Sequence, residues 1–460
     1  MYLKRSVFLT ILISQSVFAS YTSKATNYLN QFRQSTGMID VIADEDLGKA
    51  AQSHSDYMNE DNVFSHYETN QNNSHYTGHS QGDRLDHINY NFTAINENIS
   101  AGNSDLSSSM DSLFQAIYHR MNFLSFEVNR LGAGVSGKFF TYDMATKRPE
   151  YYNDIQAKNP KIVIWPPKNY DNAQPAFFNN ESPAPLPECS PGGSSSNPIS
   201  IQFNPSKSQT ITLKSFKLKD AQGNLINSKQ IDHLKEGQFA FISKDRFDWG
   251  AKYSAVFNYS EGGENKTISW NFKTKTLKYP LITLTSTDKT YYLAKNDNVT
   301  LYFKPESCMQ TSSKISYDPS KIDILKTIDK DTYYMKIKGN VGSNFEINHG
   351  EKVYKFHIFT EEIKNLSFSN VSANSVTLNW EHTSSGEETG YKIFRDGELI
   401  HTADINERSY KDTNLAKNHT YKYTIKVTND AQKEYPRGEF GNIELTPNYV
   451  VPKDAYFIDI

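Results

Sequence analysis

Three side chains in the first third of the chain, His66, Glu97 and His119, are of the types that bind metal ions or transfer protons. Two neutral imidazoles and one carboxylate can hold Zn²⁺ and leave one coordination position open. The same groups can also act as a general acid and a general base. Because these residues are far apart in the sequence, unlike the histidines of an H-E-x-x-H helix, their spacing alone does not bring them together.

Each of these residues also has an ordinary structural interpretation. His66 follows the apolar Phe64 and could be a buried, hydrogen-bonded histidine. Glu97 could accept hydrogen bonds from backbone donors at a turn, and His119 could lie at a helix C-terminus, where a positive charge is favourable. His54 lies on the apolar face of a predicted helix, so we interpret it as a core histidine, with a cleft wall as the alternative.

The remaining polar residues of this region suggest supporting roles. His75 and His79 lie in a segment rich in Asn, Gln and Ser, so we expect an exposed loop rather than a helical metal-binding pair. Arg84 is expected to pair with a carboxylate and brace the domain. No G-x-S-x-G motif occurs, and Ser65 directly precedes His66, so that their side chains would point to opposite sides of an extended segment. A serine triad is therefore not expected.

Helical and strand periodicities predict the elements that must position these residues. Apolar residues recur at helical spacing near residues 25–32, 47–58 and 106–117, and His119 with Arg120 is expected to close the third helix. Strands are predicted after Gly132 and over residues 161–165. This mixture predicts an α+β domain over residues 21–165.

A series of short motifs occurs in order along this domain. They are Ala51-Gln52-Ser53-His54, Phe64-Ser65-His66, Gly82-Asp83-Arg84, Glu97-Asn98-Ile99, His119-Arg120 with Asn122-Phe123-Leu124, and Leu131-Gly132-Ala133-Gly134. The succession, over about residues 22–145, resembles the bacterial branch of the CAP superfamily, also called SCP. The resemblance implies an αβα sandwich with a central cleft that holds two histidines and acidic residues.

The resemblance also suggests a role for each candidate residue. His66 matches the family's first histidine, Glu97 the glutamate of its E-N-I motif, and His119 its second histidine. The family has a second glutamate on the helix before the last histidine, but here residues 113–118 contain no acid and Gln115 is the nearest polar candidate. This departure counts against acid–base chemistry by paired carboxylates.

The rest of the chain is predicted to be a linker and three all-β domains of immunoglobulin-like or fibronectin type. Residues 166–198 are rich in Pro, Gly and Ser and resemble the linker of bacterial CAP proteins, so we expect an extended, flexible spacer. Alternating apolar residues then predict an Ig-like sandwich over residues 199–276 and a β-domain of no recognised family over 279–360.

Residues 362–447 resemble a fibronectin type III domain. Trp380 lies in an alternating strand like the family's core-tryptophan strand, and the stretch from Leu415 to Tyr421 resembles its tyrosine corner, where the phenol bonds back to the upstream backbone. Lys417 and His419 depart from the usual corner residues. A generic sandwich of another topology is the alternative.

The first 19 residues have the features of a signal peptide. Lys4 and Arg5 precede an apolar run from Val7 to Phe18, which ends at a small-residue cleavage site at Ala19. The run is too short to span a bilayer, and no other window of the sequence is expected to be transmembrane; an uncleaved anchor is the alternative. Cleavage changes the net charge from −3 to −5, which argues against nucleic-acid binding.

The two cysteines, Cys189 and Cys308, could form a disulfide in an oxidising compartment. The sequence leaves this open, because it does not show whether their Cα atoms approach within bonding range. Neither has a partner at zinc-ligand spacing.

Together these features predict a secreted, extracellular, periplasmic or cell-surface protein whose His/Glu cleft binds a metal ion, lipid, peptide or cell-wall fragment. His66, Glu97, His119, Gln115 and His54 are the cleft candidates, and the first three are the candidate Zn²⁺ ligands. One alternative is a Zn²⁺-dependent extracellular hydrolase. Another is a structural adhesin with a vestigial cleft.

Overall fold

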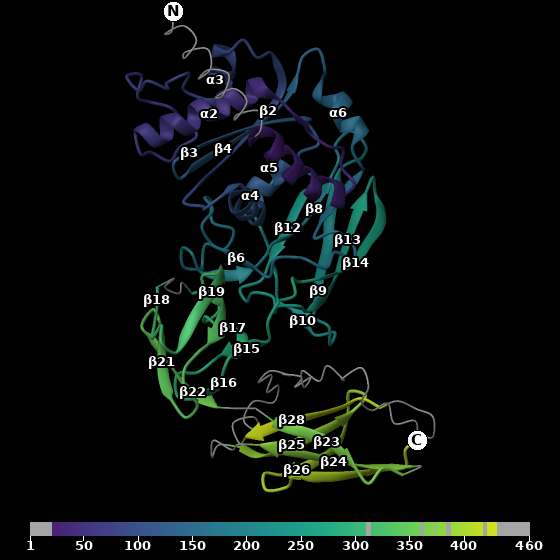
Figure 1. The fold of residues 1–460 in the computed structure, drawn as a ribbon. Helices are drawn as coiled ribbons and strands as arrows, with labels where there is room; N and C mark the ends of the chain where they lie inside the picture. Colours follow the sequence, from purple (N-terminus) through teal and green to yellow (C-terminus); the bar gives the residue numbers. More distant parts are fainter. Residues whose placement is uncertain are drawn as a thin grey trace, which may run out of the picture. The chain divides into compact units, whose positions relative to one another are not determined.

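The computed structural model describes residues 21–309, 314–359, 363–372, 374–382, 388–416 and 421–429 (Figure 1). These residues form two compact units. Unit 1 contains the described residues up to Thr276 together with Ser307–Met309, and unit 2 contains the rest. The predicted signal peptide, residues 1–19, lies outside the described residues. Within them, no helix is long and apolar enough to cross a membrane.

The first part of unit 1 is a four-stranded sheet with helices on both faces (Figure 1). The strand order is β1 (Ile42–Ala43), β3 (Arg130–Ser136), β4 (Phe139–Lys147) and β2 (Phe92–Ala101). The helices are residues 21–35, α2 (Glu45–Glu60), α3 (Gln81–His87), α4 (Leu106–Gln115), α5 (Ile117–Phe123) and α6 (Tyr152–Lys158). This part is the predicted α+β sandwich.

The two layers of helices bury alternate residues of the strands. On one face, Leu47 of α2 packs with Leu85 of α3 and Ala145 of β4. On the other, Phe114 of α4 packs with Tyr142 of β4, together with residues of the first helix and α5. Because successive strand residues point to opposite faces, one strand contributes to both hydrophobic clusters.

The Leu131–Gly134 motif sets how closely α2 approaches the sheet. A Cβ atom at Gly132 would lie 2.1 Å from the backbone carbon of Leu47, and one at Gly134 would lie 2.3 Å from the backbone nitrogen of Gln52. Neither distance is sterically possible, so any side chain here would push the helix away. The two glycines therefore serve helix–sheet packing rather than a loop.

The second part of unit 1 is a sandwich of two four-stranded sheets. One has the order β11 (Lys229–Gln230), β12 (Gln238–Ile242), β8 (Ile199–Phe203) and β5 (Ile162–Trp165). The other has the order β10 (Leu225–Ile226), β9 (Ile211–Lys219), β13 (Lys252–Glu261) and β14 (Glu264–Lys273). An aromatic core that includes Phe203, Phe257 and Trp270 lies between them.

The structure differs from the sequence prediction in the predicted linker and in the strand that precedes it. β5, assigned to the first domain by sequence, pairs with β8 of the sandwich. The segment 166–198 is folded: β6 (Ala176–Phe178) pairs with β7 (Ser194–Ser196), and Phe177 and Leu186 are buried. Composition suggested a flexible spacer, but these apolar side chains pack with Ile117 of α5 in one hydrophobic cluster.

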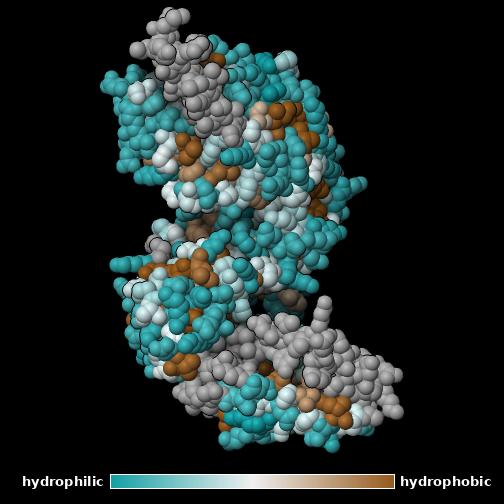
Figure 2. All heavy atoms as spheres, in the orientation of Figure 1, coloured by the Kyte–Doolittle hydropathy of each residue, from teal (hydrophilic) through white to brown (hydrophobic). Residues whose placement is uncertain are grey.

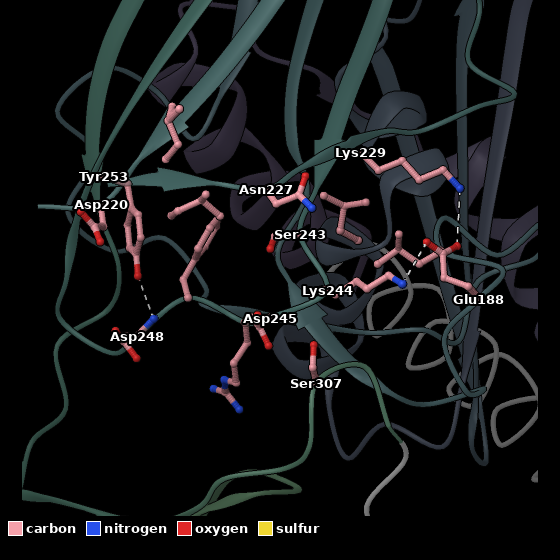
Figure 3. Close-up of a pocket in the computed structure, with 16 residues that line it drawn as sticks. Glu188, Asp220, Asn227, Lys229, Ser243, Lys244, Asp245, Asp248, Tyr253 and Ser307 are labelled. Atoms are coloured by element: carbon pink, nitrogen blue, oxygen red, sulfur yellow. Dashed lines mark hydrogen bonds and ion pairs between the residues drawn. The ribbon is translucent and has the colours of Figure 1, made fainter. Parts of the chain in front are cut away.

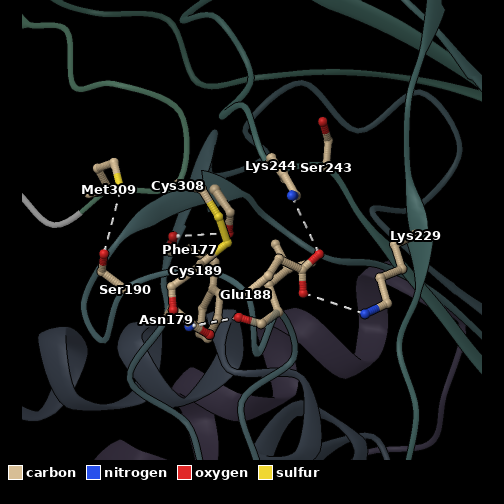
Figure 4. Close-up of a disulfide and its surroundings, with 12 residues drawn as sticks. Phe177, Asn179, Glu188, Cys189, Ser190, Lys229, Ser243, Lys244, Cys308 and Met309 are labelled. Carbon is tan, nitrogen blue, oxygen red and sulfur yellow. Dashed lines mark hydrogen bonds and ion pairs between the residues drawn. A yellow bond between two sulfur atoms is a disulfide. The ribbon is translucent and has the colours of Figure 1, made fainter.

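A disulfide joins Cys189 of this segment to Cys308, with the Cα atoms 5.0 Å apart (Figure 4). Both cysteines are buried in the same cluster as α5. The backbone N–H of Ser190 donates to the Cys308 carbonyl, and that of Cys308 donates to Ser194. The open cysteine question is therefore answered in favour of a disulfide within unit 1.

Unit 2 contains two sandwiches. The first pairs sheet β15 (Leu281–Leu284), β17 (Asn298–Phe303), β20 (Thr332–Ile337) and β19 (Ile322–Asp329) with sheet β16 (Thr290–Ala294), β22 (Lys352–Phe359), β21 (Asn344–His349) and β18 (Ile315–Tyr317). In the second, the described residues form three strands in each sheet. They are β23 (Ile363–Ser369), β24 (Ser375–His382) and β27 (Ser409–Thr413), then β26 (Glu398–Asp404), β25 (Glu388–Arg395) and β28 (Tyr423–Asn429).

The last sandwich has the expected fibronectin-like features. Trp380 is buried in its core. The phenol oxygen of Tyr421 accepts the backbone N–H of Ala416 at 2.8 Å, as predicted for a tyrosine corner. Lys417 and His419 lie outside the described residues.

On the face that Figure 2 shows, hydrophilic residues cover most of both units, and hydrophobic residues form small separate groups.

Candidate functional site

His66 and Glu97 form a hydrogen-bonded pair at the surface of the first sheet. His66 lies in the loop after α2, and its Nδ1 is 2.7 Å from Oε1 of Glu97 on β2. The imidazole is 46% exposed, whereas the carboxylate is 5% exposed. Because an ionised carboxylate only accepts, Nδ1 of His66 donates, which leaves Nε2 as the ring nitrogen for an incoming ligand.

Arg84 contacts both residues of this pair. Its fully buried guanidinium forms an ion pair with Glu97 through Nη2 and donates from Nη1 to the carbonyl of His66 at 3.1 Å. Burial by itself raises the pKa of Glu97, but the hydrogen bond from His66 and the charges of Arg84 and His54 outweigh it and lower the pKa to about 2. Glu97 is therefore ionised, and the bracing role predicted for Arg84 is confirmed.

His54 is a buried core residue, as predicted, and it belongs to the same network. Its Nδ1 lies 2.9 Å from Oε1 of Glu68, and its Nε2 lies 3.0 Å from the carbonyl of Ser65. Hydrogen bonds at both ring nitrogens therefore fix the orientation of this buried ring. Glu68 is fully buried and also lies 3.9 Å from Nε of Arg84.

Asp143 is a fully buried carboxyl group beside this network. It pairs with Glu97 across strands β2 and β4, and Gln81 donates to its Oδ1 at 2.8 Å. Complete burial, followed by the negative charge of Glu97, raises the pKa of Asp143 well above its usual value. Arg84 thus lies beside two buried acidic side chains, Glu68 and Glu97, and the raised pKa of Asp143 favours its neutral form next to them.

His119 has a different carboxylate partner, Glu181. The Nδ1 of His119 donates to Oε1 of Glu181 at 2.9 Å, and the Glu181 side chain is fully buried. The same carboxylate accepts the backbone N–H groups of Ile117 at 2.8 Å, Tyr118 at 2.7 Å and His119 at 3.3 Å. Glu181 therefore caps the N-terminus of α5 and orients the second histidine.

The position of His119 at a helix start corrects the predicted helix end. The backbone leaves the helical conformation at Ala116 (φ −73°, ψ 120°), which ends α4 and begins α5. Alanine has no side chain to cap the new helix, so the buried glutamate performs this function from a distant segment. Sequence periodicity could not show this break, because the apolar stripe runs on across it.

The two histidine–carboxylate pairs are distinct. Glu97 and Asn98 are consecutive on β2 and so point to opposite faces. Asn98 donates to the carbonyl of His119 at 3.0 Å, which holds α5 on the face opposite to the Glu97 side chain. Among the described residues, no hydrogen bond or ion pair joins His66 to His119.

The described residues do not fit the expected zinc site. Within residues 21–429, apart from the gaps given above, no three His, Cys, Asp or Glu side chains are arranged to hold a metal ion. His66 and Glu97 come together, but His119 is paired elsewhere with Glu181.

The other sequence candidates have minor roles. Gln115 ends α4, and its backbone carbonyl, rather than its side chain, contacts Arg120 at 3.4 Å. His75 and His79 are exposed, as predicted; His75 lies 3.6 Å from Glu60, and His79 stacks on Tyr67.

Glu68, Asp143 and Glu181 were not identified from sequence. Glu68 follows the Phe64–His66 motif by two residues, so its proximity was a usable signal. Asp143 and Glu181 offered none, because their contacts depend on strand register and on the folding of the presumed linker.

Unit 1 also contains a cavity of about 570 Å³ away from these histidines (Figure 3). Residues of the folded 166–198 segment, of β10–β12 and of the following loop line it. The two lysines in its lining, Lys229 and Lys244, are both paired with Glu188. Its charges are thus partly satisfied internally, and it contains none of the predicted site residues.

Comparison with known families agrees with this architecture. The family described as "CAP: Cysteine-rich secretory protein family" matches residues 26–142, and the fibronectin type III domain family matches residues 361–439. The chain therefore contains a CAP domain and a fibronectin type III domain. No curated protein sequence matches it.

Solved structures show similarity to parts of the chain. An extracellular protein containing a SCP domain from Bacillus anthracis str. Ames is 28% identical, with a TM-score of 0.25, over 27% of this chain and 40% of that one. The FN1–FN3 domains of chicken CNTN1 are 11% identical, with a TM-score of 0.18, over 50% of this chain and 89% of that one. The chain thus spans well under two thirds of the SCP-domain protein.

Proposed function

We propose that this chain is a secreted bacterial binding protein whose CAP domain presents His66 to an extracellular ligand, while the β-domains serve as spacers or adhesive modules. The observation that carries the proposal is the exposed imidazole held by a buried, ionised carboxylate. Arg84 and Glu97 fix the orientation of His66, so its Nε2 is preorganised for a hydrogen bond.

Two exposed aromatic residues, Phe64 and Tyr67, lie next to His66 in the chain and suggest the ligand chemistry. Phe64 is 54% exposed and Tyr67 is 56% exposed, and both come from the same loop as His66. Phe64 stacks on Phe139, with ring centroids 6.4 Å apart, and Tyr67 stacks on His79 at 5.1 Å. This surface suits a ligand with a hydrogen-bonding group next to a flat apolar face, as in a peptide or a cell-wall fragment.

The test compares His66→Ala with a matched control, His75→Ala. His75 is also an exposed histidine near a carboxylate, with its Nε2 at 3.6 Å from Glu60, but it lies outside the proposed site. The probes are purified peptidoglycan and vesicles of phosphatidylcholine with phosphatidylglycerol. We expect His66→Ala to weaken peptidoglycan binding about tenfold or more, the effect of losing one hot-spot contact, and His75→Ala to leave it unchanged. Equal binding by both variants would refute the proposed site and favour the structural adhesin.

The Zn²⁺-dependent hydrolase is the second candidate, and the geometry gives it less support because the described residues form two separate pairs. Metal analysis of the purified protein separates the two functions. Stoichiometric zinc, with release of soluble peptidoglycan fragments that is lost in both His66→Ala and His119→Ala, would replace the binding role by catalysis.

A further inference from the structure

One sheet of the unit 1 sandwich presents a row of lysines on its outer face. In β9, β13 and β14, alternate residues such as Leu218, Ala255 and Phe272 are buried in the core. The intervening positions therefore face outward. Lys217 and Lys219 of β9, Lys252 of β13 and Lys273 of β14 occupy such positions; we call these four the lysine face.

The lysine face carries an uncompensated positive charge. None of its four amines forms an ion pair within the described residues. Lys252 lies directly opposite Lys273 in the ladder, an arrangement of like charges that destabilises a sheet. This local repulsion points to a role in binding anions, because it does nothing for the fold.

Two carboxylates, Asp171 and Asp220, lie near this face but form no ion pair with its four lysines. Asp220 follows Lys219, but its oxygens accept hydrogen bonds from its own turn, including the side chain of Asn224 at 2.9 Å. Asp171 lies in the segment that runs beside β14. Over residues 199–276 the chain has 12 Lys and Arg against seven Asp and Glu, although its overall net charge is −3. The positive charge is thus concentrated in this domain.

Uncharged hydrogen-bonding groups share the same face. Ser254, Asn258 and Asn271 lie at outward positions beside the lysines. Asn258 donates to Ser215 at 2.9 Å and accepts from Thr267 at 2.7 Å, which gives a fixed polar row across three strands. At one end, a hollow of about 520 Å³ is lined by Lys252 and Lys273 together with Ser254 and Asn271, and the carboxylates Asp171 and Asp220 also line it.

We propose that the lysine face binds an acidic polysaccharide, a sugar chain that carries carboxylate or sulfate groups. Amines provide contacts for the charges, and the hydroxyl and amide side chains provide donors and acceptors for sugar hydroxyls. A flat row that spans three strands suits an extended polymer better than a small anion. This surface is separate from His66, so its function does not depend on that of the CAP domain site.

The experiment measures binding of the full chain to polygalacturonate and heparin, with dextran as the neutral sugar and polyphosphate as the charged chain without sugar. The test variant replaces Lys217, Lys219, Lys252 and Lys273 by serine. The matched control replaces four exposed strand lysines of unit 2 by serine: Lys326, Lys336, Lys355 and Lys392. Both variants lose the same net charge.

We expect the wild type and the control to bind at least one acidic polysaccharide, more weakly as salt increases. The test variant should bind it roughly thirtyfold more weakly, as the loss of four exposed charge contacts implies. Its thermal midpoint should not fall, since removing the Lys252–Lys273 repulsion does not weaken the fold. Equal binding by both variants, dextran binding of equal strength, or polyphosphate binding as tight as that of the acidic polysaccharides would overturn the proposal.

Discussion

Replacing Glu181 by glutamine tests whether this distant carboxylate holds the second histidine. Its Oε1 accepts from the backbone of Tyr118 and from both the backbone and the ring of His119, while Oε2 accepts from Ile117. Glutamine keeps one oxygen in place of Oε1 but puts an NH₂ group in place of Oε2, opposite the backbone N–H of Ile117. It also removes the negative charge at the start of α5.

The size of the effect follows from these contacts. Loss of an N-terminal cap costs about 0.5–2 kcal/mol, and a hydrogen bond to a charged group contributes about 1.5–3 kcal/mol. Since one hydrogen bond is lost and three are weakened, we expect the free energy of unfolding of unit 1 to fall by about 2–3 kcal/mol. For a domain of this size, that lowers the midpoint of thermal unfolding by roughly 5–10 °C.

Tryptophan fluorescence is a suitable assay, because Trp165, Trp249 and Trp270 all lie in unit 1. Hydrogen exchange adds a local readout, since the amides of residues 117–119 should exchange faster in the variant. The matched control is Glu188→Gln, in the same segment but 36% exposed and paired with lysines at 3.5 and 3.7 Å. This control should lower the free energy of unfolding by less than about 0.5 kcal/mol. Equal shifts for the two variants would refute the capping role.

Three further perturbations test the buried charges and the disulfide. Asp143→Asn should raise the midpoint of thermal unfolding more at pH 8 than at pH 4. Because the pKa of Asp143 is raised in the folded chain, the wild type loses stability as the pH rises above about 4, where the carboxyl of the unfolded chain ionises. A difference between the two proteins that does not depend on pH would contradict this. Arg84→Gln leaves Glu97 buried without its cation and should lower the free energy of unfolding, measured in urea, by about 3–5 kcal/mol. A decrease of less than about 1 kcal/mol would argue against the network. Cys189→Ser with Cys308→Ser removes a cross-link between residues 119 apart and should cost about 2–5 kcal/mol, whereas an unchanged urea midpoint would show that packing alone holds the segment.

Local patterns in the sequence were enough to predict the fold class of each domain. The alternating apolar residues around Trp380 and the phenol of Tyr421 correctly indicated a fibronectin-like sandwich. The helical stripes and the Gly132 motif likewise indicated the α+β domain. In each case the signal lies in residues close together in the chain, which share a face because of helix or strand geometry.

Composition was a poor guide to the segment 166–198. Proline, glycine and serine are common in flexible linkers, but they are equally compatible with irregular backbone packed against a neighbouring domain. Here Phe177, Leu186 and Cys189 are buried against α5, so long-range packing decides the structure of the segment.

The sequence by itself determined that His66, Glu97 and His119 belong to a CAP domain and that Arg84 would pair with a carboxylate. Only the tertiary structure decided which carboxylate each histidine contacts: Glu97 for His66, and Glu181, 62 residues away, for His119. A hydrogen bond between distant segments leaves no periodic trace in a single sequence. It is set by which side chains the folded backbone buries together, where an unpaired charge would be too costly to keep.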